Sequence, residues 1–178
     1  MERQASEEGS YKRLNKIDNL QSVLDSDILE SLQQKYKVSN NLEKLNDARA
    51  EVGFYFRDLE LRDGLLQNKS ILDLGSANHF FDEYCEQKYG SRVVAVDIEQ
   101  EELGVNHPQG IVTDARSLPF KDDSFDLVIS HASMPHILVP QQKRGKWLTK
   151  IDGETREKTL EDVLDVFRES YRTLKVGG

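Results

Sequence analysis

Residues 71–81 read ILDLGSANHFF, and this stretch decides which fold the chain is expected to adopt. It begins with the apolar run from Ile71 to Leu74, which is typical of a short strand buried on both faces. Gly75 follows immediately, and a glycine there lets the backbone turn sharply and come close to a ligand. From Phe80 to Lys88 the spacing is helical, and Gly90 is a suitable helix end. The stretch therefore predicts a strand, a tight turn and a helix.

Three more strand-like segments follow, at Arg92–Ile98, Gly110–Thr113 and Phe125–Ser130. Residues 99–104 are able to form a short helix, and Lys158–Leu174 has the pattern of a final amphipathic helix. The apolar residues of that last helix share one face: Leu160, Val163, Leu164, Phe167, Tyr171 and Leu174. This order is that of βαβ units, so we predict an α/β fold with a doubly wound parallel sheet. Ligands bind such sheets at the carboxyl ends of the strands, where the strand order reverses, and the first strand lies there.

Two helices are predicted ahead of the sheet. Residues 1–16 are polar and expected to be disordered. Apolar residues then recur at helical spacing from Ile17 to about Tyr36, and a second helix, capped by Asn40, continues to Leu59. We therefore divide the chain into a helical extension, 1–69, and a sheet domain, 70–178.

The composition excludes several classes of protein. The chain is 37% hydrophobic and 31% charged, which suits a globular protein with a well-solvated surface. No apolar run could span a bilayer and no secretory signal is visible, so a cytoplasmic location is expected. The single cysteine, Cys85, excludes an internal disulfide and fits the core face of a helix. The net charge of −8 disfavours non-specific nucleic-acid binding, and the scattered histidines predict no metal site.

Polar residues at the strand ends form a candidate nucleoside site. Asp97 ends the second strand about 20 residues beyond the glycine turn, where a carboxylate can accept hydrogen bonds from both ribose hydroxyls. Ile98 is then placed to lie against an adenine face. After the third strand, Asp114 is a candidate acceptor for the adenine amino group and the Ala115 amide a candidate donor. Simpler readings stay open: a plain glycine turn, a surface aspartate at a strand end, and Asp114 as a loop cap.

Four runs in this order resemble successive motifs of the class I S-adenosylmethionine-dependent methyltransferases, of the type 11 kind. They are ILDLGSANHFF, VVAVDIE, TDARSLPFKDDSFDLVIS and FRESYRTLKVGG, and together they cover about residues 70–178. The third run is the most specific, because an acidic residue, a Leu-Pro-Phe turn and Asp-Ser-Phe-Asp before an apolar strand are common in this family. The resemblance implies a Rossmann-like sheet, S-adenosylmethionine as cofactor and methyl transfer as the activity.

The resemblance also implies roles for individual residues. Gly75, Ser76 and Ala77 would pass beneath the methionine part of the cofactor, and Asp73 would hold its amino group. Asp97 and Ile98 would bind the ribose and adenine, and Asp114 and Ala115 would read the adenine. Ser130 and His131 would face the methionine part and the incoming substrate. The family usually has glycine at the positions of Ala77 and His79, and these departures put tight cofactor binding in doubt.

Methyl transfer from a sulfonium is an in-line displacement that depends mainly on positioning. A general base is needed only if the acceptor must lose a proton, and His131 and His136 are the candidates. The long connection after the fourth strand is where substrate selection is expected. A small-molecule acceptor is expected over a macromolecule, with no membrane partner.

The resemblance also raises the expectation that the fold is incomplete. The family's sheet has seven strands, whereas four are visible in this sequence. By resemblance these would lie in the order three, two, one, four, with the fourth strand at an unpaired edge. The chain is therefore expected to be a truncated form.

Three other readings remain open from the sequence. The chain could be a cofactor-binding module that has lost catalysis, which the altered glycine turn favours. It could be a nicotinamide-dependent oxidoreductase, although that fold needs a three-glycine fingerprint and only Gly75 is present here. The N-terminal helices could instead serve in binding a partner.

Overall fold

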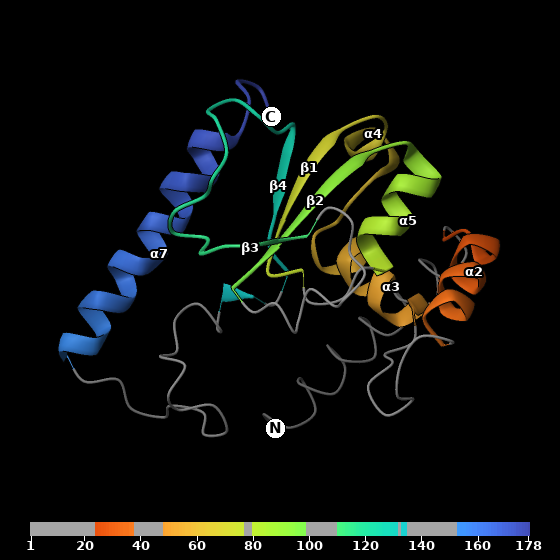
Figure 1. Cartoon of the computed structure of the whole chain (residues 1–178), viewed down its shortest axis with the longest axis horizontal. Helices are drawn as coiled ribbons and strands as arrows, with labels where there is room; N and C mark the ends of the chain where they lie inside the picture. The colour runs from red at the N-terminus through yellow and green to blue at the C-terminus, as the bar shows by residue number, and fades with distance from the viewer. Residues whose placement is uncertain (1–23, 38–47, 77–79, 99–109, 132, 135–152) are drawn as a thin grey trace, which may run out of the picture.

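The computed structural model describes residues 24–37, 48–76, 80–98, 110–131, 133–134 and 153–178. Within them the chain forms a parallel sheet of four strands in the order β3-β2-β1-β4 (Figure 1). The strands are β1 (Ser70–Leu74), β2 (Arg92–Asp97), β3 (Ile111–Val112) and β4 (Leu127–Ile129). This confirms the predicted α/β class and the predicted strand order.

The register of the sheet brings the carboxyl ends of its strands to one edge. Leu74 on β1 pairs with Val96 on β2, and Asp73 pairs with Ile129 on β4. Asp97, at the end of β2, pairs with Val112 on β3. The residues that follow these strands therefore come together along that edge, which is where parallel sheets bind ligands.

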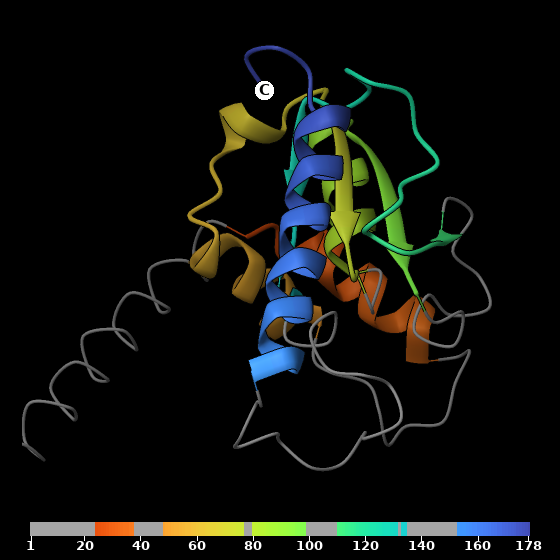
Figure 2. The ribbon, with the colours of Figure 1, turned by 90° about the vertical axis from the view of Figure 1, so that its left-hand side faces the viewer.

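Helices cover the two faces of the sheet (Figures 1 and 2). One face packs against α5 (Phe80–Tyr89), which is followed outward by α2 (Ser26–Lys37) and α3 (Ala48–Asp58), with the short α4 (Asp63–Leu66) nearby. The other face carries α7 (Gly153–Thr173). Among the described residues no helix is both long and apolar enough to cross a membrane.

Side-chain alternation along β1 divides the core into two clusters. Ile71 packs with the residues of α2, α3 and α5, whereas Leu72 and Leu74 pack with Val166 of α7. Because successive strand residues point to opposite faces, Asp73 lies on the same face as Ile71. The predicted buried strand is confirmed, and its one carboxylate is directed toward α3 and α5.

Aromatic side chains fill the space between α3 and α5. The rings of Tyr55 and Phe81 stack with centroids 4.2 Å apart, and the Phe56 ring meets Tyr84 edge-on at 5.8 Å. Cys85 is buried in the same cluster, as predicted for a core residue. The helices α2 and α3 therefore share one core with β1 and α5. The domain boundary between residues 69 and 70 stays a prediction.

The helix and strand bounds differ from the predicted ones mostly at the ends. The first helix is described from Ser26 and the second from Ala48, so Ile17 and the Asn40 cap lie outside the described residues. The predicted short helix at 99–104 also lies outside them. The final helix begins earlier than predicted, at Gly153.

The predicted buried face of the final helix is wrong in part. Four of its apolar residues are at least half exposed: Leu160, Leu164, Phe167 and Tyr171. The face turned to the rest of the protein instead carries Val166 and Thr173, which are 2% and 0% exposed. Hydrogen bonds of polar side chains account for this orientation of the helix. Glu169 and Arg172, near the same face, hydrogen-bond to the segment that precedes β4, and these bonds set how the helix is turned.

Just before β4, the chain pairs with the residues that follow α7. Leu174, just after α7, forms an isolated parallel bridge with Phe125, and the Lys175 amide donates to the Phe125 carbonyl at 2.8 Å. Among the strands that the structure describes, β4 is therefore an edge strand, as the sequence predicted.

Candidate functional site

The turn after β1 requires a glycine. Gly75 has a φ of +72°, and its amide donates to the carbonyl of Val96 on β2 at 2.7 Å. A Cβ at this position would lie 2.2 Å from the Cβ of Ser133. Both the left-handed backbone and the close approach of the segment after β4 therefore exclude a side chain. Ala77 and His79, the two departures from the family pattern, lie outside the described residues.

A buried carboxylate stands immediately before this turn. Asp73 is fully buried, and both its oxygens lack a hydrogen-bond partner among the residues that the structure describes. Burial raises the pKa of Asp73 well above its usual value, and the charge of Asp82 raises it further. An unpaired buried carboxylate is costly, so its position calls for a positively charged or hydrogen-bonding ligand.

More acidic groups surround Asp73. Asp82, in the first turn of α5, is 1% exposed, and burial raises its pKa to about 8. Glu51 on α3 is also buried, and its charge acts on both aspartates. The pKa of Tyr55 is raised by burial first and then by the charge of Asp73. The Oγ of Ser76 is buried and has no hydrogen-bond partner among the described residues.

His131, which follows β4, is tied to α3. Its Nε2 lies 3.0 Å from Oδ2 of Asp58, and its ring is 4.6 Å from the ring of Tyr55. A hydrogen bond from Arg57 lowers the pKa of Asp58 to about 2, so Asp58 is ionised at neutral pH. An ionised partner favours the tautomer in which Nε2 carries the proton and Nδ1 is the free base. His136, the other histidine candidate, lies outside the described residues.

The predicted nucleoside residues lie at the ends of β2 and β3. Asp97 is half-buried as the last residue of β2, and its backbone carbonyl accepts a hydrogen bond from Thr113 at 2.9 Å. Ile98 follows it with half of its surface exposed. An exposed apolar side chain beside a strand-end carboxylate fits the predicted ribose and adenine contacts.

Asp114 already holds an arginine. Its carboxylate accepts from Arg116 Nε at 3.0 Å and Nη2 at 2.6 Å, and Arg116 also reaches Asp162 on α7 at 2.8 Å. These bonds lower the pKa of Asp114. An adenine amino group would have to share this carboxylate with Arg116, which the sequence did not indicate. Ala115 lies between the two, half-buried.

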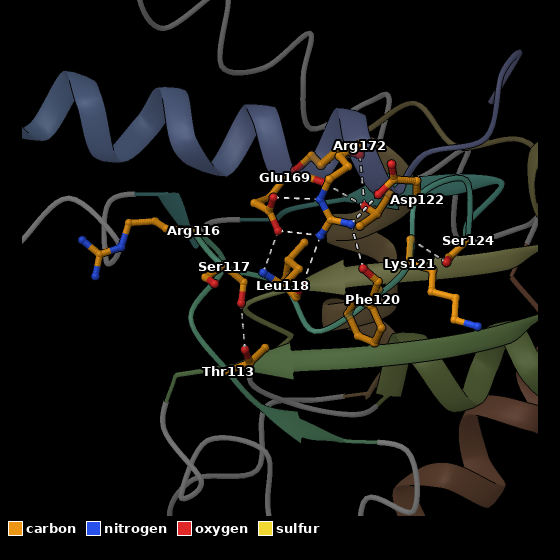
Figure 3. Close-up of polar contacts among 12 residues, drawn as sticks. Thr113, Arg116, Ser117, Leu118, Phe120, Lys121, Asp122, Ser124, Glu169 and Arg172 are labelled. Atoms are coloured by element: carbon orange, nitrogen blue, oxygen red, sulfur yellow. Dashed lines mark hydrogen bonds and ion pairs between the residues drawn. The ribbon is translucent and has the colours of Figure 1, made fainter.

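The Leu-Pro-Phe segment is held by two residues that the sequence analysis missed (Figure 3). The Leu118 amide donates to Glu169 Oε2 at 2.8 Å. Arg172 donates to the carbonyls of Leu118 and Phe120, and it is paired with Glu169 at 2.7 Å. We call Glu169 and Arg172 the α7 clamp. Their i, i+3 spacing in the run FRESYR was a visible signal of a helix-surface pair, but its target in a distant loop was not visible.

We expect Glu169→Gln to loosen the segment that follows β3. The substitution removes the charge that pairs with Arg172 and weakens the acceptor for the Leu118 amide. Hydrogen exchange of the Leu118 amide should accelerate, while exchange in β1 stays unchanged. The matched control is Asp165→Asn, which removes the exposed pair with Arg168 on the same helix. Equal exchange at Leu118 in both variants would contradict a clamping role.

The structure gathers most of the predicted site residues at one edge of the sheet. At the end of β1 or just after it lie Asp73, Gly75 and Ser76. Asp97 ends β2 and Ile98 follows it, and Ser130 and His131 follow β4. Ser130 and Ser133 form a hydrogen bond between their hydroxyls. Ala77 is not described. No group of three or more metal-binding side chains occurs in the described ranges.

The residues at this edge of the sheet fall within a match to a known protein family. Residues 72–152 match the model of a family described as a methyltransferase domain, and this range contains the glycine turn and both strand-end aspartates. These residues are therefore similar to a methyltransferase domain. The matched range includes the glycine turn, Asp97 and the Leu-Pro-Phe segment, on which the resemblance was based.

Several solved structures are similar to this chain. A provisionally assigned sarcosine dimethylglycine methyltransferase from Galdieria sulphuraria is 18% identical with a TM-score of 0.50, over 72% of this chain and 43% of that one. A SAM-dependent methyltransferase from Aquifex aeolicus is 16% identical with a TM-score of 0.48, over 73% and 63% of the two chains. The YcgJ protein of Bacillus subtilis is 23% identical with a TM-score of 0.45, over 72% and 47%.

The chain spans less than half the length of the Galdieria and Bacillus proteins that it matches. No curated protein sequence matches the chain. The likeness to the Galdieria protein supports a Rossmann-like fold, and activity and substrate have to be argued from the site.

Proposed function

We propose that this chain binds S-adenosylmethionine at the carboxyl edge of β1 and β2 and transfers its methyl group to a small-molecule acceptor. The observation that carries the proposal is Asp73, a fully buried carboxylate without a hydrogen-bond partner among the described residues. It stands beside a glycine turn that comes directly after a central strand. The ammonium of the cofactor's methionine part is a group that such a carboxylate would bind.

The other residues at this edge fit the rest of the cofactor. Gly75 has no side chain, so its backbone could come close to the methionine part. Asp97 is half-buried at the end of β2, where a carboxylate could accept from ribose hydroxyls, and Ile98 offers an apolar surface to an adenine. Asp114 is the weakest fit, because its carboxylate already accepts from Arg116.

When bound, the cofactor supplies an electrophilic methyl group on a positively charged sulfur. The contribution of the chain's own residues is to hold and orient, which suits an in-line displacement. His131 is the candidate to accept a proton from the acceptor, through Nδ1. Asp58 orients its ring through Nε2, and Tyr55 packs against it. An acceptor that carries no proton to lose would not need His131.

We expect Asp97→Asn to weaken S-adenosylmethionine binding roughly 10- to 100-fold. Hydrogen bonds to a charged group contribute about 1.5–3 kcal/mol, and each 1.4 kcal/mol changes the dissociation constant about tenfold. Calorimetric titration of the wild-type chain and the variant measures this change. Asp165→Asn, on the exposed surface of α7, is the matched control and should bind as the wild type does. An unchanged dissociation constant in Asp97→Asn would argue against the ribose role.

Transfer itself is tested by the product of the cofactor. The chain is incubated with S-adenosylmethionine and a panel of small amines, alcohols and thiols, and S-adenosylhomocysteine is measured. Acceptor-dependent product that falls in His131→Gln, with binding unchanged, supports methyl transfer with His131 as base. Tight binding with no product from any acceptor supports the alternative of a module that binds cofactor without catalysis.

A further inference from the structure

We propose that Asp82 is a positioning residue that shares one proton with Asp73, and that the ammonium of an incoming ligand displaces this proton. The proposal rests on the proposed function, because it takes the ammonium to be that of the cofactor's methionine part. The proposed site then contains two carboxyl groups, that of Asp73 on β1 and that of Asp82 on α5. Asp82 acts on the ligand only through Asp73.

The geometry places two carboxyl groups in one dry space. Asp73 points from β1 toward α5, and Asp82 lies in the first turn of that helix, 0% and 1% exposed respectively. Two ionised carboxylates offer acceptors only, so neither can donate to the other. One proton between them removes a buried charge and provides a donor. A proton held at this point gives a partner to one of the two Asp73 oxygens, which have none among the described residues, and leaves the other for a ligand.

The groups around Asp73 and Asp82 favour a protonated pair when no ligand is bound. The charged groups that act most strongly on the two aspartates are acids, Glu51 on α3 and Glu86 on α5. Tyr55 faces Asp73 from α3, and the hydroxyl of Ser76 lies beside Asp82. Cys85 of α5 lies near both aspartates and Lys88, Tyr84 is buried in the same core cluster, and the His131 ring packs against Tyr55. Burial raises the pKa of Asp82 to about 8, so the pair retains a proton at neutral pH.

A cationic ligand changes this balance. An ammonium beside Asp73 favours the ionised carboxylate, because an opposite charge lowers its pKa. The O–H bond of the shared carboxyl then breaks, its proton passes to the buffer, and the ammonium takes its place as the donor. Binding should therefore release about one proton at neutral pH. A ligand with the same adenosine but no ammonium should release none.

The experiment is calorimetric titration of the whole chain at pH 7 in phosphate and in Tris, two buffers with very different heats of protonation. The ligands are S-adenosylhomocysteine, which carries the ammonium without a charged sulfur, and 5′-methylthioadenosine, which lacks the amino-acid part. We expect about one proton released with the first ligand and none with the second. Asp82→Asn should reduce the release while binding persists, and Asp165→Asn should leave it unchanged.

The outcomes separate this proposal from the one on which it rests. Binding of S-adenosylhomocysteine with equal heats in both buffers overturns the proton exchange and leaves the cofactor site intact. Equal release with 5′-methylthioadenosine, or undiminished release in Asp82→Asn, also overturns it. If neither ligand binds, the proposed function fails, and this inference fails with it. The comparison of two ligands uses the wild-type chain, so the test holds even if Asp82→Asn does not fold.

Discussion

Gly75→Ala should destabilise the fold by roughly 2–5 kcal/mol. A non-glycine residue in the left-handed region costs about 1–2 kcal/mol, and forcing an extra group into a packed site costs about 1–3 kcal/mol more. Both apply here, because φ is +72° and the new Cβ would lie 2.2 Å from the Cβ of Ser133. The segment after β4 would have to move away from β1, and any ligand site at this edge would be lost with it. Urea unfolding followed by circular dichroism measures the change.

Gly64→Ala is the matched control for this prediction. Gly64 lies in α4, and a Cβ there would have nothing within 4 Å. Its backbone is compatible with alanine, so the substitution should be neutral or stabilise by up to about 1 kcal/mol. A Gly75→Ala chain as stable as Gly64→Ala would show that the turn tolerates a side chain. The close packing of Ser133 on Gly75 would then be wrong.

Stability should fall as the pH rises from about 5 to about 8. The pKa of Asp82 is raised to about 8, and that of Asp73 lies well above its usual 3.8. Over this range the unfolded chain has lost protons that the folded chain retains. The free energy of unfolding then decreases with pH, by up to about 1.4 kcal/mol per pH unit for each retained proton. Above about pH 8 the slope should become shallower, since the folded chain then loses the proton of Asp82.

Other carboxylates affect stability at lower pH, where they make the free energy of unfolding rise with pH. The pKa values of Asp58, Asp114, Asp126 and Glu169 are lowered, so their contributions are present at neutral pH and lost only as the pH falls below about 5. Urea midpoints between pH 5 and 8 therefore report on the buried pair. Asp82→Asn should reduce the slope, and the double variant with Asp73→Asn should abolish it. A wild-type chain with constant stability over this range contradicts a protonated pair.

The sheet could be predicted from the sequence because its signals are local. The run from Ile71 to Leu74 is apolar throughout and ends at a glycine, and β2 is strongly β-branched, so both strands form where expected. The strand-end positions of Asp73 and Asp97 followed directly from those strands. The strand order matched because the resemblance supplied a topology that single-sequence patterns do not contain.

What could not be predicted depends on contacts between distant segments. The apolar periodicity of the final helix pointed to a face through Leu164 and Phe167, but the polar bonds of Glu169 and Arg172 turn other residues inward. Asp114 looked free for a ligand, although Arg116 two residues later binds it. Asp82 had no signal at all, because a carboxylate in a first helical turn usually interacts with solvent and the helix dipole.

The central claim is that the carboxyl edge of β1 and β2 binds S-adenosylmethionine, and an amide chemical-shift titration tests it most directly. The ¹H–¹⁵N spectrum of the labelled chain is recorded while S-adenosylmethionine is added. We expect saturable shifts at Gly75, Ser76, Asp97 and Ile98, with the amides of α2 unaffected. A spectrum that does not change, or saturable shifts that lie only on α2 or the outer face of α7, would contradict the account.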